Sequence, residues 1–182
     1  MTHFRDTEDT LEVAAMEVFD TLGYETVNAY SEKFGADGTL GRDARYDVVL
    51  SYRLREALER LNPDLPAIAY KNAIEILDTD LSIKNSLEAA NQEIYHLLRD
   101  GITVTYPDPD GGGDLQETLR VIDWKDVRQN DFLAARQVWG ETDAHKRRPD
   151  VMVYVIGIPL VLIELKAVHR NVYHGYRDNV RD

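Results

Sequence analysis

The chain has 182 residues, no cysteine, and a formal net charge of −12 from 33 acidic and 21 basic side chains. Without cysteine it has neither a disulfide scaffold nor a thiolate zinc site, and its composition fits a reducing cytoplasm. The first residues are polar and of mixed charge, so we expect no secretory signal. The longest apolar run, residues 151–163, is shorter than the roughly 20 residues of a membrane span. We therefore expect a cytoplasmic protein with no membrane partner.

The charge is unevenly distributed along the chain. Residues 141–182 carry seven Lys or Arg against six acids, so this segment has a net charge of +1 and the rest of the chain −13. Three of the five histidines lie in the same segment. An anionic partner should therefore meet the chain between residues 141 and 182.

Helical periodicity dominates the first hundred or so residues. Apolar residues recur at helical spacing in three stretches, which we predict as helices: residues 7–22, 47–60 and about 66–98. Gly23 ends the first of them. Residues 31–45 are rich in Gly and Asp and are predicted as a loop.

The pattern changes to that of β-strands after Gly101. We predict five strands: residues 102–106, 118–124, 130–138, 151–155 and 160–165. The last two are apolar on both faces, as in central strands, and are separated by a turn near Gly157 to Pro159. Residues 167–182 are predicted as a final helix.

This order of elements predicts an α/β fold with a mixed central β-sheet flanked by helices and an N-terminal helical region. We predict one domain over residues 1–182, with a helical part over about 7–100 and a sheet part over about 101–182.

Three charged residues stand at the two ends of the apolar stretch: Asp150, Glu164 and Lys166. A hairpin would place Asp150 opposite Glu164 or Leu165, and Lys166 would point to the same face as Glu164. Two converging carboxylates suit Mg²⁺, and a neighbouring lysine can orient a water for attack on phosphorus. The alternative is an Asp that happens to begin a strand, with an exposed Glu-Lys pair at the end of the next.

The motif Pro149-Asp150 followed by Glu164-Leu165-Lys166 resembles the PD-(D/E)-x-K nuclease motif. The wider string RRPDVMVYVIGIPLVLIELK resembles the N-terminal endonuclease domain of the restriction (motor) subunit of type I restriction-modification enzymes. Further stretches agree with that family in order and spacing: residues 12–15, 22–24, 91, 96–98, 101, 121–124, 130–132 and 137. The resemblance implies a restriction-endonuclease-like core.

The resemblance also implies roles for individual residues. Asp150 and Glu164, with the backbone carbonyl of Leu165, would coordinate Mg²⁺, for which Mn²⁺ would substitute. Lys166 would position or activate the hydrolytic water. Glu12 matches the acid of the family's opening helix and is a candidate further metal ligand; a solvated carboxylate on a helix face is the alternative.

The family implies phosphodiester hydrolysis of double-stranded DNA, together with modification and specificity subunits and ATP-driven translocation. No Gly-x-x-x-x-Gly-Lys-Ser/Thr phosphate loop is present, since Gly113 is followed by Asp114 and Leu115. ATP would therefore bind only in motor domains outside these residues, and we expect the chain to be a fragment of a larger subunit. Asn179 stands where the family often has the Gln of a Gln-x-x-x-Tyr motif, and its Tyr partner would be residue 183.

Five residues are candidate DNA contacts: Lys146, Arg147, Arg148, Arg177 and Asn179. A solvated basic loop is the alternative for the first three. Two other functions stay open: a nuclease-fold domain of another DNA-processing enzyme, and a non-catalytic DNA-binding or docking domain.

Overall fold

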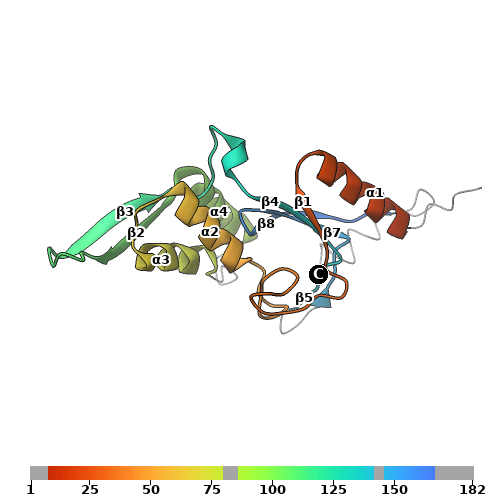
Figure 1. The fold of residues 1–182 in the computed structure, drawn as a ribbon, viewed down its shortest axis with the longest axis horizontal. Helices are drawn as coiled ribbons and strands as arrows, with labels where there is room; N and C mark the ends of the chain where they lie inside the picture. The colour runs from red at the N-terminus through yellow and green to blue at the C-terminus, as the bar shows by residue number, and fades with distance from the viewer. Residues whose placement is uncertain (1–7, 80–85, 142–145, 167–182) are drawn as a thin grey trace, which may run out of the picture. The chain divides into compact units, whose positions relative to one another are not determined.

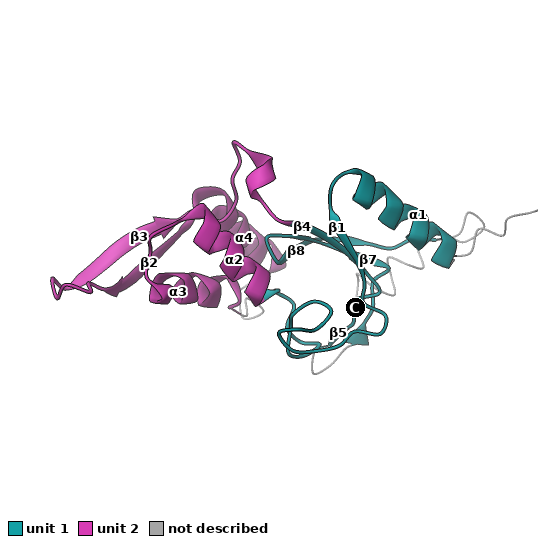
Figure 2. Ribbon diagram, in the orientation of Figure 1, with its two compact units in different colours: residues 1–50, 132–182 teal, residues 51–131 magenta. Residues whose placement is uncertain are grey.

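The computed structural model describes residues 8–79, 86–141 and 146–166 (Figure 1). Its contacts divide the chain into two compact units, one formed by residues 1–50 and 132–182 and the other by residues 51–131 (Figure 2). The first unit is therefore built from two separate stretches of sequence. The expectation of a single domain stays a prediction.

A four-stranded mixed sheet forms the centre of the first unit. Its strands are β1 (Glu25–Asn28), β4 (Phe132–Arg136), β7 (Val151–Val155) and β8 (Ile158–Ile163), in the order β1-β4-β7-β8. β1 runs parallel to β4, and the other neighbours are antiparallel. α1 (Glu8–Thr21) packs on β1 and β4. The mixed sheet and the first helix confirm the sequence predictions.

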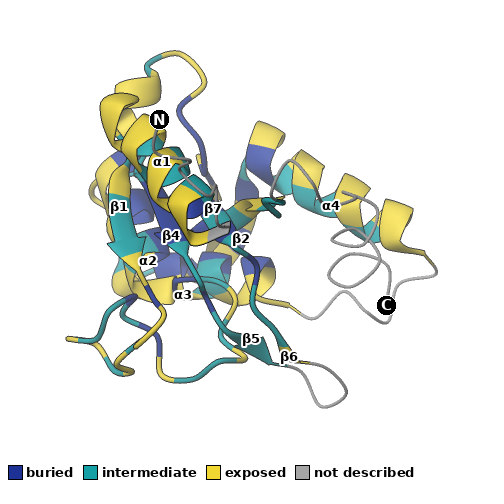
Figure 3. Cartoon of the chain, turned by 90° about the vertical axis from the view of Figure 1, so that its right-hand side faces the viewer, coloured by how far each residue is buried: buried dark blue, intermediate teal, exposed yellow. Residues whose placement is uncertain are grey.

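The two faces of this sheet bury different parts of the chain. Because side chains alternate along a strand, Leu133 of β4 packs on one face with Leu50, which belongs to the segment after β1. Ala134 packs on the other face against Met16 and Phe19 of α1. Figure 3 shows the outer side of α1 exposed, as expected for a helix that covers a sheet with one stripe.

A buried ion pair closes the loop that follows β1. Arg42 donates to both oxygens of Glu32 at 2.7 and 2.6 Å, and to the backbone carbonyl of Trp139 at 2.6 Å. The two side chains are only 2% and 3% exposed. A buried guanidinium needs such a full set of acceptors. The pair therefore holds the predicted loop, which has neither helix nor strand over residues 31–45, in one conformation.

The β7–β8 hairpin turns at Ile156 and Gly157, which both have positive φ, 50° and 81°. This two-residue turn, with Val155 paired to Ile158, is of the type whose twist matches antiparallel strands. The turn therefore lies slightly earlier in the sequence than predicted, at Ile156 and Gly157 instead of near Gly157 to Pro159, and Pro159 lies inside β8. A proline is tolerated there because, among the described strands, β8 is the edge of the sheet.

The prediction that residues 160–165 form a central strand was wrong. β8 has one neighbour in the described sheet, and Leu160, Val161 and Leu162 are 41%, 49% and 41% exposed. Apolar composition on both faces of a strand is common in central strands, but it does not distinguish them from an edge strand.

The second unit contains α2 (Ser51–Leu61), α3 (Ala67–Leu77) and α4 (Leu87–Asp100) with the antiparallel hairpin of β2 (Ile102–Pro107) and β3 (Asp114–Leu119). Residues 108–113 form the turn between β2 and β3. A short 3-10 helix, η1 (Val127–Gln129), follows. α3 packs against β2.

Two predicted elements of this unit were wrong in extent. The helix expected over about 66–98 is described as α3 and α4, and residues 80–85 between them lie outside the described part. The strand expected at 118–124 ends at Leu119, because the backbone of Arg120 bonds to the Asn62 side chain instead: its N–H donates at 2.7 Å and its carbonyl accepts at 2.9 Å. β2 and β3 form a separate sheet and do not join the main sheet of the first unit.

Candidate active site

The β7–β8 hairpin brings Asp150 and Glu164 to one end of the main sheet. The strand register pairs Val151 with Ile163, and Asp150 and Glu164 are the next residues outward on each side. The backbone N–H of Leu165 donates to Asp150 Oδ2 at 2.6 Å. The expected juxtaposition across the hairpin is therefore observed. The catalytic roles of these residues stay predictions.

Lys166 lies close to Glu164, although both residues follow the end of β8 at Ile163. Its Nζ is 3.8 Å from Glu164 Oε2, and the two side chains are 19% and 12% exposed. This N–O distance is long for a hydrogen-bonded ion pair, so the carboxylate attracts the ammonium electrostatically but does not hold it tightly. Two carboxylates and one ammonium thus meet at one end of an apolar hairpin.

Asp150 is fixed by its backbone as well as by its side chain. The backbone N–H of Gln137, just after β4, donates to the carbonyl of Asp150 at 3.0 Å. Pro149 before it is buried. Both neighbouring strands therefore restrain Asp150, which is what a preorganised ligand position needs.

Glu12 of α1 is buried next to this group, being only 5% exposed. Gln137 Nε2 donates to its Oε1 at 2.7 Å, and Arg136 NH1 lies 3.8 Å from its Oε2. Burial raises the pKa of Glu12, the Gln137 hydrogen bond lowers it, and the negative charge of Asp150 raises it further. The alternative of a solvated helix-face carboxylate is therefore wrong.

Gln137 is the residue of this site that the sequence pattern gave no reason to single out for chemistry. Its backbone has φ of 60°, a left-handed conformation that is unfavourable for a residue other than glycine or asparagine. The same residue contacts Glu12 through its side chain and Asp150 through its backbone. No signal in the local sequence identifies such a conformation in advance.

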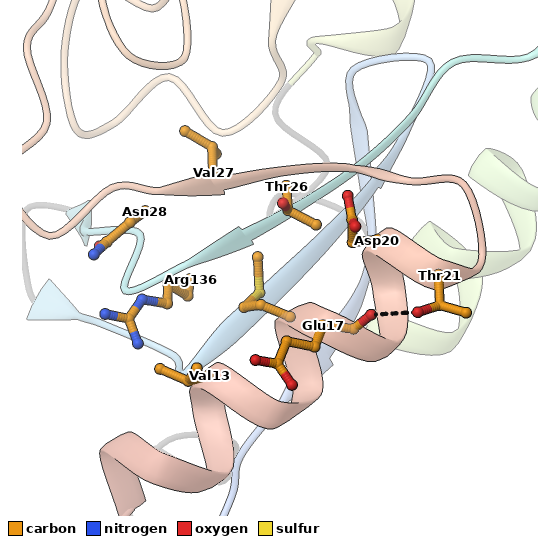
Figure 4. Close-up of a pocket in the computed structure, with 9 residues that line it drawn as sticks. Val13, Glu17, Asp20, Thr21, Thr26, Val27, Asn28 and Arg136 are labelled. Atoms are coloured by element: carbon orange, nitrogen blue, oxygen red, sulfur yellow. Dashed lines mark hydrogen bonds between the residues drawn. The ribbon is translucent and has the colours of Figure 1, made fainter.

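A hollow of about 500 Å³ opens beside Glu12. It is lined by seven residues: Asp9, Glu12, Asn28, Tyr30, Ser31, Arg136 and Gln137. A second hollow, of about 690 Å³, lies along α1 and β1 (Figure 4). Arg136 lines both. Neither hollow is lined by Asp150, Glu164 or Lys166. The first is the one related to the candidate site, because it is lined by Glu12 and by Gln137, which bonds to both Glu12 and Asp150.

The donor set fits a hard divalent cation. Asp150 and Glu164 offer carboxylate oxygens and Leu165 a carbonyl, which are the ligand types that Mg²⁺ prefers. Burial is the main cause of the raised pKa of Glu12, and the negative charge of Asp150, which a bound cation would offset, raises that pKa further. Among residues 8–79, 86–141 and 146–166, no three His, Cys, Asp or Glu side chains are grouped closely enough to hold a metal by themselves. The contribution of the Leu165 carbonyl stays a prediction.

The candidate DNA contacts are only partly described. Lys146, in the β5 (Gly140–Glu141) and β6 (Lys146–Arg147) hairpin, pairs with Glu141 at 2.7 Å. Arg147 is also on β6, and Arg148 packs over aromatic rings. Arg177 and Asn179, with the helix predicted over residues 167–182, lie outside the described residues. In the part of the chain that the structure covers, no helix is long and apolar enough to cross a bilayer.

Comparison with known proteins places these observations in a family. Residues 5–182 match the family described as type I restriction enzyme R protein N terminus. The chain is 31% identical over 190 residues to the type I restriction enzyme HindI endonuclease subunit of Haemophilus influenzae, covering 96% of this chain and 17% of that protein. It is 26% identical over 171 residues to the putative type I restriction enzyme MjaIXP endonuclease subunit of Methanocaldococcus jannaschii, covering 88% of this chain and 15% of that protein. The chain belongs to the family of type I restriction enzyme R protein N termini.

Proposed function

We propose that this chain is the Mg²⁺-dependent endonuclease domain of a type I restriction R subunit and that it hydrolyses phosphodiester bonds of double-stranded DNA. The observation that carries the proposal is the meeting of Asp150, Glu164 and Lys166 at one end of the β7–β8 hairpin. Both relatives are called endonuclease subunits, which supports the same activity here. We propose a restriction-endonuclease-like core for the first unit, since the site lies at the end of an antiparallel hairpin in a mixed sheet.

Each residue then has a distinct part in the reaction. Asp150, Glu164 and the Leu165 carbonyl would hold the metal, and the hydrogen bond from Leu165 N–H restrains the Asp150 carboxylate. Lys166 orients the attacking water and stabilises negative charge that develops on the phosphate. A bound Mg²⁺ would supply charge neutralisation at the phosphate and a more acidic water. Mn²⁺ should substitute because it prefers the same oxygen ligands.

Glu12 extends the negative side of the site. Its position near Asp150 would strengthen cation binding by adding a third carboxylate to the local field. Whether it is a direct ligand or acts through the field, removing its charge should weaken metal affinity.

The remaining parts of the reaction lie outside the chain. The chain spans 17% and 15% of the length of the two relatives. We propose that ATP-driven translocation belongs to other domains of the subunit, and that modification and specificity subunits are its partners in the cytoplasm. These subunits would supply sequence recognition, which would leave this domain only the cutting step.

The test compares Asp150→Asn, Glu164→Gln and Lys166→Ala in the assembled enzyme, with Lys71→Ala as the control. Lys71 is an exposed lysine of α3 paired with Glu75 on the same helix. Each motif change should abolish DNA cleavage while circular dichroism and ATP hydrolysis persist, and the control should cut normally. Calorimetry with Mn²⁺ should show binding that Glu164→Gln removes.

Normal cutting by the Lys166→Ala enzyme would refute the nuclease assignment. DNA binding without any cutting by the unaltered enzyme would favour a non-catalytic DNA-binding or docking domain instead. Cutting that needs neither ATP nor the other subunits would favour a domain of another DNA-processing enzyme.

A further inference from the structure

Two arginines that are far apart in the sequence share one aromatic ring. The guanidinium carbon of Arg148 lies 4.8 Å from the centroid of the Trp139 ring, and that of Arg45 lies 5.2 Å from it. Arg148 also lies over the ring of Tyr30, at 5.2 Å. Arg45 comes from the loop before α2, Trp139 from the segment after β4, and Arg148 from the segment before β7. The first unit therefore brings together three separate parts of its sequence to build this cluster.

Stacking on an indole orients a guanidinium without removing its hydrogen-bond donors. The electron-rich face of the ring attracts each cation electrostatically. Arginine keeps its planar fork of N–H donors free at the edge while its face lies on the ring, so a stacked arginine loses less entropy when it binds a second group. Each of the two arginines on this ring is thus oriented for binding an anion.

The neighbouring carboxylate does not neutralise the cluster. Glu141 lies 3.9 Å from Arg45 through Oε2, while its Oε1 is taken by Lys146 at 2.7 Å. The Arg45 and Glu141 side chains are 42% and 34% exposed, so this long pair is weakened by solvent. The Glu141 carboxylate is therefore shared between two cations, Arg45 and Lys146, in a chain whose other parts are strongly acidic.

The cluster adjoins the candidate active site by two routes. Arg148 is separated from Asp150 only by the buried Pro149. Tyr30, on which Arg148 lies, also lines the hollow that contains Glu12 and Gln137. An anion held by Arg148 would therefore be close to the residues proposed to hydrolyse DNA.

We propose that Arg45 and Arg148, stacked on Trp139, form a phosphate-binding site for the backbone of the DNA strand that enters the active site. This inference rests on the proposed function and adds the residues that hold the substrate. Guanidinium groups bind phosphate oxygens in pairs of hydrogen bonds, and such contacts position nucleic acid without reading its sequence. The site thus suits a domain whose partners would supply sequence recognition.

The test measures binding of a fluorescent DNA duplex by the 182-residue chain, with Ca²⁺ in place of Mg²⁺ so that binding is separated from cutting. Arg45→Gln and Arg148→Gln remove the charge but keep a long polar side chain. Each lost phosphate contact should reduce the slope of log affinity against log salt by about 0.9. The same slope predicts about eightfold weaker binding at about 0.1 M salt for each variant, and about 60-fold for the pair.

Two further variants separate orientation from charge. Trp139→Leu leaves both arginines charged but removes the ring, so binding should weaken although both charges remain. Trp139→Phe keeps an aromatic face and should bind better than Trp139→Leu. Arg128→Gln is the matched control, since Arg128 is an exposed arginine of the second unit paired with Asp126, and it should bind like the unaltered chain. Circular dichroism and thermal unfolding check that each variant is folded.

Unchanged affinity and salt slope in the folded Arg45→Gln, Arg148→Gln double variant would overturn the inference. Failure of the unaltered chain to bind the duplex at low salt would also overturn it. If the Lys166→Ala enzyme cuts normally while the arginine variants bind weakly, the proposed nuclease mechanism fails and the phosphate site stands.

Discussion

Replacing Gln137 tests whether one residue holds Glu12 in place beside Asp150. Its amide donates to the buried Glu12 carboxylate at 2.7 Å, and its backbone has φ of 60°. A hydrogen bond to a charged group contributes about 1.5–3 kcal/mol. Gln137→Ala should therefore reduce the free energy of unfolding by about that amount. Gln137→Gly loses the same bond, but glycine adopts positive φ without the roughly 1–2 kcal/mol penalty of other residues.

The two substitutions should therefore differ in stability and agree in activity. The relief of strain in the glycine variant is partly offset by about 0.5–1 kcal/mol of extra entropy in its unfolded chain. Gln137→Gly should thus be more stable than Gln137→Ala by about 1 kcal/mol. Both variants lack the amide, so both should cut DNA more slowly, by similar factors, in the assembled enzyme.

Urea unfolding measures these differences because each unit contains one of the two tryptophans. A Trp124→Phe background leaves Trp139 to report on the first unit. Combining Glu12→Ala with Gln137→Ala should show a coupling energy of about 1.5–3 kcal/mol, because the second change removes a bond that the first has already broken. Gln92→Ala, in the second unit, is the control. A coupling near zero, or equal stability of the alanine and glycine variants, would refute this account of Gln137.

Three further predictions follow from other contacts. Arg42→Ala should destabilise the first unit by about 3–5 kcal/mol in urea unfolding, because it leaves the buried Glu32 carboxylate without its partner. Arg55→Ala, which breaks an exposed ion pair, is the comparison. A loss of stability in Arg42→Ala no greater than in Arg55→Ala would contradict the prediction. Because the folded structure raises the pKa of Glu12, the contribution of this residue to stability is fully present below its unfolded pKa of 4.5 and is lost as the pH rises through its folded pKa. Glu12→Gln should flatten this pH dependence in urea unfolding at a series of pH values. An unchanged pH profile would contradict the prediction. Gly157→Ala should lower thermal stability by about 1–2 kcal/mol, since φ is 81° at this position. It should also weaken Mn²⁺ binding measured by calorimetry. If stability and Mn²⁺ binding both equal those of the unaltered chain, the turn does not set the register of Asp150 and Glu164.

The parts of the fold that could be predicted from the sequence are those whose residues determine structure locally. α1 has a helical stripe and ends at Thr21, two residues before Gly23, whose φ is 85°. β2 alternates buried and exposed residues, and the glycines at 111–113 mark the turn after it. The apolar hairpin with charged ends predicted that Asp150 and Glu164 would lie together, because antiparallel pairing fixes which residues are opposite.

The missed elements depend on partners that are distant in the sequence. β1 is a four-residue strand, Glu25 to Asn28, with only one strongly apolar residue, and it exists because it pairs in parallel with β4 more than 100 residues later. Parallel pairing leaves no hairpin signal in the local sequence. The early end of β3 similarly depends on Asn62, which takes the backbone hydrogen bonds of Arg120.

In the candidate site, too, the residues that could be predicted from the local sequence differ from those that depend on distant partners. Asp150, Glu164 and Lys166 could be predicted because each is a charged residue at the end of an apolar strand, where the cost of burying charge requires a reason. The environment of Glu12 could not be predicted, since its carboxylate sits on a helix among other acids and nothing in the local sequence distinguishes a buried member from a solvated one. The burial of Glu12 depends on Arg136, the last residue of β4, and on Gln137, which follows it.

The clustering of Arg45 and Arg148 on Trp139 likewise depends on the loop fixed by the Arg42–Glu32 pair, because Arg42 bonds to the carbonyls of both Arg45 and Trp139. A buried ion pair with no chemical role of its own thereby positions the residues proposed to hold the DNA, so weakening it should impair DNA binding even though neither Arg42 nor Glu32 belongs to the proposed phosphate site.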